Sequence, residues 1–254
     1  MRSGFVSLIG RSNVGKSTLI NQLVSHKIAI TSNKPQTTRN IIQGVYNEPD
    51  CQIVFVDTPG IHKPMNKLGK MLNKQSSALI HDVDAILFLV DASVPLGPGD
   101  KFIIEKLKGN DIPVILVLNK IDKINNEQLL FKINEYKDLY EFADIVPVSA
   151  LANDNVEHLI KVIKKYLIDE VRYFDEDTIT SNSKYFMISE FVREQLMNFM
   201  NEEIPHSIAC VTSSFEEKQN IANIIVDIIV DRDSLKKNSH WSQWFGSKKS
   251  WIRG

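Results

Sequence analysis

The sequence predicts a doubly wound α/β domain, and two observations support this fold class. Short apolar runs rich in β-branched residues alternate with stretches of helical periodicity. The runs are apolar at successive positions, which is typical of parallel strands covered by helices on both faces. The expected strands are Phe5–Ile9, Ile53–Val56, Ala85–Val90, Val114–Leu118 and Ile145–Val148.

Helical patterns fill the intervals between these runs. The run Ile41–Tyr46 is expected to add an edge strand that pairs antiparallel with the next strand. Residues 1–168 are therefore expected to form one domain with a mostly parallel sheet. The expected helices are Lys16–Val24, roughly Leu68–Ile80, Asp100–Lys108, Glu127–Tyr140 and Val156–Leu167.

A smaller α+β segment is expected after residue 168. Residues 169–183 are acidic and polar and predict a linker, residues 184–237 predict a partial domain, and residues 238–254 predict a disordered, atypical tail. One helix on a two-stranded hairpin buries little apolar surface, so the chain from about residue 178 is expected to be loosely ordered or to lean on the first domain. The partial domain is expected to contain the helix Tyr185–Glu203 and the strands Ser207–Ser213 and Ile221–Val230.

Composition limits the possible classes of protein. The 254 residues are 43% hydrophobic and 24% charged, with a net charge of -1, so no global positive field favours nucleic acid. Cys51 and Cys210 lack metal-type spacing and are expected to be reduced thiols. The apolar runs are too short to span a bilayer. A soluble, cytoplasmic protein is expected, with peripheral attachment at the inner face of the cell membrane left open.

A glycine-rich motif joins the first expected strand to the first expected helix. Gly10–Ser17 fits the pattern G-x-x-x-x-G-K-[ST]. Glycines let the backbone wrap around phosphate oxygens, and N–H groups at a helix start attract negative charge. Lys16 is expected to bridge β- and γ-phosphates, and the Ser17 hydroxyl to bind Mg²⁺. The expected phosphate-binding residues here are Gly10, Asn13, Val14, Gly15, Lys16, Ser17 and Thr18.

A second motif, Asn119-Lys120-Ile121-Asp122, follows the strand Val114–Leu118 and predicts the base. Guanine presents two donors on one edge, and the Asp122 carboxylate can accept both. Adenine would leave this carboxylate unpaired, at a cost on the order of several kcal/mol, which argues against an ATPase. N–H groups of Ser149-Ala150-Leu151 are expected to meet guanine O6. The expected guanine-binding residues are Asn119, Lys120, Asp122, Ser149, Ala150 and Leu151.

Two further segments predict a sensor of the γ-phosphate. Asp57-Thr58-Pro59-Gly60 ends the strand Ile53–Val56. Asp57 is expected to hold Mg²⁺ through water, and the Gly60 N–H to contact the γ-phosphate. The polar segment Asn33–Arg39 predicts a mobile switch whose threonine completes the Mg²⁺ shell, with Thr38 as first choice and Thr37 as second. The expected metal ligands are Ser17, Thr38 and Asp57.

These motifs, in this order, resemble the translation-factor-related GTPases and, among them, the Era family. The family-like sequences are G-x-x-N-x-G-K-S at Gly10–Ser17, P-Q-T-T-R at Pro35–Arg39 and D-T-P-G-I at Asp57–Ile61. The run Ile225–Ser234 resembles the second strand of the family's RNA-binding KH domain. The resemblance therefore extends from Phe5 to about Lys237.

The resemblance implies a P-loop NTPase fold and a GTP-hydrolysing switch that uses GTP, GDP and Mg²⁺. The implied catalytic residues are Lys16, Thr38 and Gly60. Ile61 stands where many small GTPases have a water-orienting glutamine, and Asn13 matches a K⁺ ligand of some relatives. Slow, K⁺-sensitive hydrolysis is therefore expected. The implied partners are the small ribosomal subunit and its 16S rRNA, and DNA is not among them.

The chain departs from the family pattern after Lys237. A KH domain holds the nucleic-acid backbone with a G-x-x-G loop, and Asn238–Gly254 contains none. This tail instead holds all three tryptophans of the chain. A frameshift or misassigned gene end after Lys237 would explain it, and a segment that stacks on bases or anchors at a membrane interface is the alternative. The missing loop puts RNA binding by this chain in doubt.

Two other functions remain open from the sequence. One is a regulatory module that holds GDP or GTP with negligible turnover, which Ile61 permits. The other is a related GTPase of tRNA modification or of large-subunit assembly. Such proteins carry other appended domains and lack the run Ile225–Ser234, which favours the small subunit.

Overall fold

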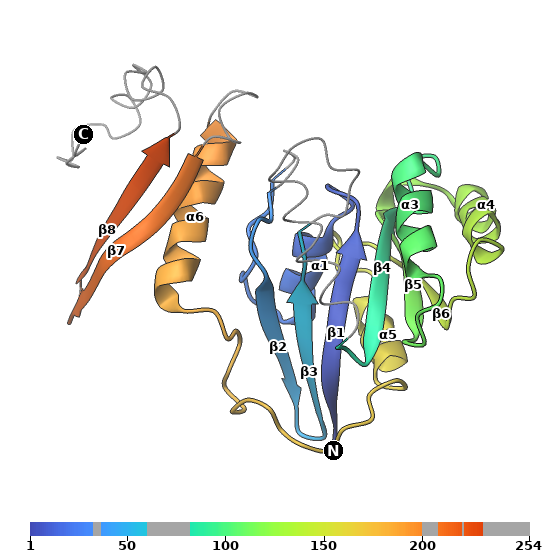
Figure 1. Cartoon of the computed structure of the whole chain (residues 1–254), viewed down its shortest axis with the longest axis horizontal. Coiled ribbons are helices and arrows are strands. Elements are labelled where there is room, and N and C mark those ends of the chain that lie inside the picture. The colour runs from blue at the N-terminus through green and yellow to red at the C-terminus, as the bar shows by residue number, and fades with distance from the viewer. Residues whose placement is uncertain (33–36, 60–81, 200–207, 220, 231–254) are drawn as a thin grey trace. The chain divides into compact units, whose positions relative to one another are not determined.

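The computed structural model describes residues 1–32, 37–59, 82–199, 208–219 and 221–230. It separates into two compact units, Met1–Asn182 and Ser183–Gly254. Figure 1 shows the elements of each unit.

The first unit is built on a six-stranded sheet in the order β2-β3-β1-β4-β5-β6. β2 pairs antiparallel with β3, and the remaining neighbours pair in parallel. This confirms the predicted α/β fold class and the antiparallel edge strand. The strands are β1 (Arg2–Gly10), β2 (Ile42–Glu48), β3 (Cys51–Asp57), β4 (Ala85–Asp91), β5 (Val114–Asn119) and β6 (Asp144–Val148).

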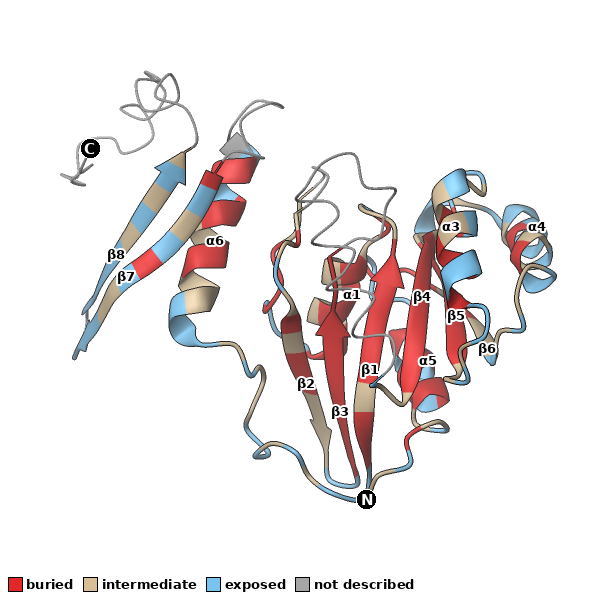
Figure 2. Cartoon of the chain, viewed as in Figure 1, coloured by how far each residue is buried: buried red, intermediate tan, exposed pale blue. Residues whose placement is uncertain are grey.

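Helices cover both faces of this sheet. α1 (Lys16–Leu23) and α5 (Val156–Ile163) contact each other, whereas α3 (Pro98–Leu107) and α4 (Asn126–Lys137) share a buried cluster with alternate residues of β4 and β5. Because β4 and β5 are covered on both faces, their apolar runs are almost fully buried (Figure 2). The helix expected at Leu68–Ile80 lies outside the described residues.

α3 begins before its expected start at Asp100. Pro98 occupies the first turn, where its missing N–H needs no partner. The Gly97 N–H donates to the Asp100 carboxylate at 3.0 Å, which satisfies a helix-start donor. The Asp100 side chain is fully buried.

Residues 169–182, which lie within the predicted linker 169–183, are bonded to the first sheet and are named the strap. The Ser3 N–H donates to the Asp169 carbonyl at 2.7 Å, and the Val45 N–H donates to the Ile179 carbonyl at 2.8 Å. The buried Gln52 amide accepts from the Tyr173 and Phe174 N–H groups. The strap therefore occupies the free edge of β2. The predicted domain boundaries themselves stay predictions.

The second unit contains a helix and a hairpin. α6 (Lys184–Phe199) packs on β7 (Ile208–Lys218), which pairs antiparallel with β8 (Ile221–Val230). The Ser189 hydroxyl and the Thr212 hydroxyl are buried and lie 2.9 Å apart. The expected tail Asn238–Gly254 lies outside the described residues. Within the described parts of the chain, no helix has the length and apolar character needed to cross a membrane.

Candidate nucleotide-binding site

The glycine-rich motif forms a loop between β1 and α1, and its conformation requires glycine at two places. Gly15 has a φ of +99°, and a Cβ on it would lie 2.2 Å from the Asn119 side-chain nitrogen. A Cβ on Gly10 would lie 2.5 Å from the Leu89 carbonyl oxygen. The loop therefore passes too close to β4 and β5 for any side chain at these positions.

Lys16 folds back over this phosphate loop. Its ammonium donates to the carbonyl oxygens of Gly10 at 3.2 Å and Arg11 at 3.1 Å. Burial lowers the pKa of Lys16, and the negative charge of Asp57 opposes this shift. A buried ammonium beside N–H groups at a helix start is a favourable position for a polyphosphate.

The three residues predicted as Mg²⁺ ligands lie together. The Ser17 hydroxyl donates to Asp57 Oδ2 at 2.9 Å and lies 2.9 Å from the Thr38 hydroxyl. Burial raises the pKa of Asp57 to about 6, although Lys16 and the two hydroxyls act against this rise. Asp57 Oδ1 is buried and has no hydrogen-bond partner among the described residues. Two hydroxyls and a carboxylate are hard oxygen ligands, so this cluster fits Mg²⁺.

Asn119 connects the phosphate loop to the loop after β6. Its side-chain nitrogen donates to the Val14 carbonyl at 2.8 Å, and its side-chain oxygen accepts from the Ala150 N–H at 3.0 Å. Asn119 is the last residue of β5, and it is buried. The segments expected to bind phosphate and base therefore meet at the carboxyl edge of the sheet, where ligands bind in such folds.

Asp122 lies in a short 3-10 helix, η1 (Ile121–Lys123), next to the loop after β6. Its Oδ1 accepts a hydrogen bond from the Ser149 hydroxyl, which in turn accepts from the Ala152 N–H at 3.1 Å. Leu151 is 75% exposed, so its side chain does not pack into the protein. The arrangement places Asp122 beside the N–H groups of the loop after β6, as recognition of a purine edge requires.

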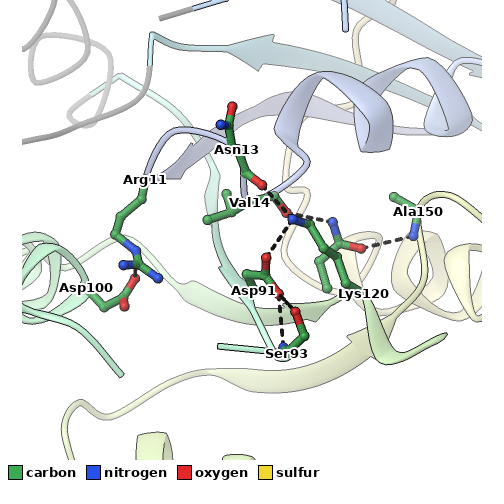
Figure 3. Close-up of polar contacts among 9 residues, drawn as sticks. Arg11, Asn13, Val14, Asp91, Ser93, Asp100, Lys120 and Ala150 are labelled. Carbon is green, nitrogen blue, oxygen red and sulfur yellow. Dashed lines mark hydrogen bonds and ion pairs between the residues drawn. The ribbon is translucent and has the colours of Figure 1, made fainter. Parts of the chain in front are cut away.

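Lys120 has a left-handed φ of +67° and points back to the phosphate loop. Its ammonium donates to the Asn13 carbonyl at 2.7 Å and forms an ion pair with Asp91 at 2.6 Å (Figure 3). Of the remaining predicted residues, Val14 is buried and Thr18 follows Ser17 in α1. Gly60, like Ile61, lies outside the described residues.

Three charged residues of the site were not predicted from the sequence: Arg11, Asp91 and Asp100. Arg11 forms an ion pair with Asp100 at 2.9 Å. Burial raises the pKa of Asp91, but hydrogen bonds from Lys120 and Ser93 outweigh this effect and hold the pKa below its usual value. Asp91 could have been suspected because it ends a strand of the parallel sheet, as Asp57 and Asn119 do.

Comparisons with known proteins give a family match and structural matches. A family model described as "50S ribosome-binding GTPase" matches residues 5–120. A structure of Era in complex with MgGDPNP and nucleotides 1506–1542 of 16S ribosomal RNA is 40% identical, with a TM-score of 0.88, and the match covers 93% of this chain and 81% of that one. A structure of a variant of Aquifex aeolicus Era bound to GDP.AlF4- gives the same values.

A more distant structure supports the fold of the first unit. It is a GTP-binding protein from Sulfolobus solfataricus in complex with GDP, 25% identical with a TM-score of 0.50, and the match covers 64% of this chain and 51% of that one. The match to Era is stronger in both identity and coverage. This chain therefore belongs to the Era family of GTPases.

Proposed function

We propose that this chain binds and hydrolyses GTP and acts as a switch in assembly of the small ribosomal subunit. The observation that carries the proposal is the position of Asn119, whose one side chain bonds both the phosphate loop at Val14 and the base loop at Ala150. The same edge of the sheet then offers amides for phosphates and, close by, the Asp122 carboxylate for the donor edge of guanine. The match to a GTPase family model and the Era-like fold support GTP binding and hydrolysis.

In this proposal each predicted residue has a defined role. Lys16 contacts the β- and γ-phosphates together with amides of the loop. Ser17, Thr38 and Asp57 would hold Mg²⁺, which, when bound, neutralises charge on the phosphate oxygens. Guanine is bound by the N-K-x-D motif and the loop after β6. Those residues are Asn119, Lys120, Asp122, Ser149, Ala150 and Leu151.

For hydrolysis, Lys16 and Thr38 hold the γ-phosphate while water attacks in line, and the Gly60 N–H adds a further contact. Ile61 has no group that can orient water by hydrogen bonding. We assign Asn13 as a ligand of K⁺. The bound K⁺ would supply positive charge that stabilises the negative charge on the phosphate oxygens during hydrolysis. Asn13 has a left-handed φ of +64° in the loop. Turnover that is equal in K⁺ and Na⁺ buffers would remove this assignment.

Two assays test the choice of guanine over adenine and the turnover of GTP. Competition by unlabelled GTP and ATP against a fluorescent GDP should show a strong preference for GTP, and phosphate release in the presence of Mg²⁺ and K⁺ should show slow turnover. Asp122→Ala should reduce the preference of GTP over ATP. Binding of GTP without phosphate release over hours, even with ribosomal subunits present, would instead support a regulatory module that does not hydrolyse GTP.

The small ribosomal subunit is proposed as partner because the Era structure described above contains a 16S rRNA fragment. A ribosomal partner implies a cytoplasmic location. The second unit offers little positive charge for RNA in its described residues: Lys184 and Lys218 are exposed, whereas Arg193 is buried in an ion pair with Glu190. No described feature supports membrane attachment, and we do not propose it.

Sedimentation of ribosomal subunits with this chain tests the partner. GTP or a non-hydrolysable analogue should increase co-sedimentation with small subunits relative to GDP, because only these carry the γ-phosphate that would order the segment around Thr38. Large subunits serve as the matched control. Preferential binding to large subunits would favour the alternative of a large-subunit GTPase, and binding to neither would limit the proposal to nucleotide binding.

A further inference from the structure

The connection from β4 to α3 carries a carboxylate at each end, and each carboxylate holds a cation that contacts the phosphate loop. Asp91 is the last residue of β4 and Asp100 lies in the first turn of α3. Neither is expected to contact the nucleotide. Figure 3 shows both ion pairs beside the phosphate loop.

Asp91 holds Lys120 against the loop. One carboxylate oxygen lies 2.6 Å from the Lys120 ammonium, and the other accepts from the Ser93 N–H at 3.0 Å and from the Ser93 hydroxyl at 2.6 Å. The same ammonium donates to the Asn13 carbonyl at 2.7 Å. With both oxygens engaged, the Asp91 carboxylate is fixed in orientation, and the phosphate loop is tied at Asn13.

Asp100 holds Arg11 on the other side of the loop. The pair is 2.9 Å apart, and the Asp100 side chain is fully buried. The Arg11 side chain lies so close to the start of α3 that a Cβ on Gly99 would be 2.6 Å from Arg11 Cδ, and a Cβ on Gly97 2.9 Å from its guanidinium. The backbone of α3 thus fits the side chain, and the loop is tied at Arg11.

Both ion pairs join side chains of the protein itself. The charges of Arg11 and Lys120 are balanced by protein carboxylates, so phosphate is not needed to place them. A binding loop that already has its bound shape avoids an ordering cost when the ligand arrives. The two points of contact on the loop, Arg11 and Asn13, flank Ser12. They therefore restrain the part of the loop that wraps the phosphates.

We propose that Asp91 and Asp100 are positioning residues that hold the phosphate loop in its nucleotide-binding shape before nucleotide binds. This inference rests on the proposed GTP binding. Loss of either carboxylate frees the Lys120 or Arg11 side chain and leaves the loop to sample other conformations. The fraction of protein that is competent to bind then falls, and apparent affinity falls with it.

Fluorescent-GDP binding by the full chain tests the inference. Asp91→Asn and Asp100→Asn should each weaken GDP binding by about tenfold, mainly through slower association. Asp91→Glu, which keeps the charge, should recover part of the loss. Glu105→Gln, on the same helix as Asp100, is the matched control. It breaks an exposed ion pair with Lys108 and should leave the affinity for GDP unchanged.

Hydrogen exchange of residues 10–17 in the nucleotide-free protein gives a second readout. It should be faster in both aspartate variants than in wild type or Glu105→Gln, while circular dichroism confirms that the fold is retained. Unchanged exchange and unchanged affinity in the two variants, or an equal loss of affinity in Glu105→Gln, would overturn the inference. A wild-type chain that binds no GDP would refute the proposed function instead, and the exchange comparison would still decide whether the ties hold the loop.

Discussion

The strands of the two units are similar in sequence and different in burial. β4 reads A-I-L-F-L-V-D and is buried at every position except the last, whereas β8 reads I-A-N-I-I-V-D-I-I-V and has no buried position. Figure 2 shows this contrast directly. Each face of β4 meets a helix layer, while the only described helix of the second unit packs on β7. An apolar run therefore predicts a strand but not its burial, which depends on the neighbours that the fold supplies.

The contrast extends to chemistry, because the polar groups assigned to nucleotide all lie in the first unit. Lys16→Ala should weaken GDP binding by roughly 100-fold, since a charged hydrogen-bond donor to phosphate is lost. Fluorescent-GDP titration measures the effect, and Lys184→Ala, an exposed lysine of the second unit, is the control that should bind normally. Equal losses in both variants would mean that the site is not confined to the first unit.

Burial in the first unit should also dominate stability. Leu116 is fully buried in β5 within the cluster under α3 and α4. Leu116→Ala should lower the free energy of unfolding by about 2–5 kcal/mol, because it leaves a cavity in a packed core. Urea unfolding followed by circular dichroism provides the value, and a loss below about 1 kcal/mol would show that this core relaxes around the cavity.

The free energy of unfolding, measured over a pH series, can separate the contribution of the Asp91 ion pair from that of burial. The pKa of Asp91 is below its ordinary value in the folded protein, so its carboxylate stabilises the fold above about pH 4, and this contribution is lost as pH falls through the folded pKa. Asp91→Asn should lower the free energy of unfolding by about 1 kcal/mol at pH 7. The difference between the variant and wild type should shrink below about pH 4. A difference that is constant from pH 7 to pH 3 would contradict an ionic role.

The smallest effect is expected in the hairpin of the second unit. Ile225 on β8 is 58% exposed. Ile225→Ala should change the free energy of unfolding by about 0.5 kcal/mol, which reflects strand propensity rather than burial. The same urea experiment applies. A cost close to that of Leu116→Ala would show that Ile225 is buried in solution, and the contrast between the two units would then fail.

The sequence allowed much of the first unit to be predicted, because local patterns are sufficient there. Strands, the glycine-rich loop and the residues at the ends of β3 and β5 follow from runs and motifs of fewer than about ten residues. Arg11, Asp91 and Asp100 were missed because their partners lie far along the chain. The strap was missed because many of its contacts are made by backbone groups and polar side chains, among them Asn47, Gln52 and Asn182, which leave no apolar periodicity.

The strap also determines where the chain leaves the first unit. Asn182 accepts a hydrogen bond from the Gln43 N–H at 3.0 Å, and its amide donates to the Ile41 carbonyl at 3.4 Å. Ile41 is three residues after Thr38, which lies beside Ser17 and Asp57 in the cluster proposed to hold Mg²⁺. Asn182, where the chain leaves the first unit, is thus bonded to backbone groups that lie only a few residues after Thr38. A displacement of the backbone that starts at Thr38 would therefore reach the end of the strap through its bonds to Ile41 and Gln43, without crossing the sheet.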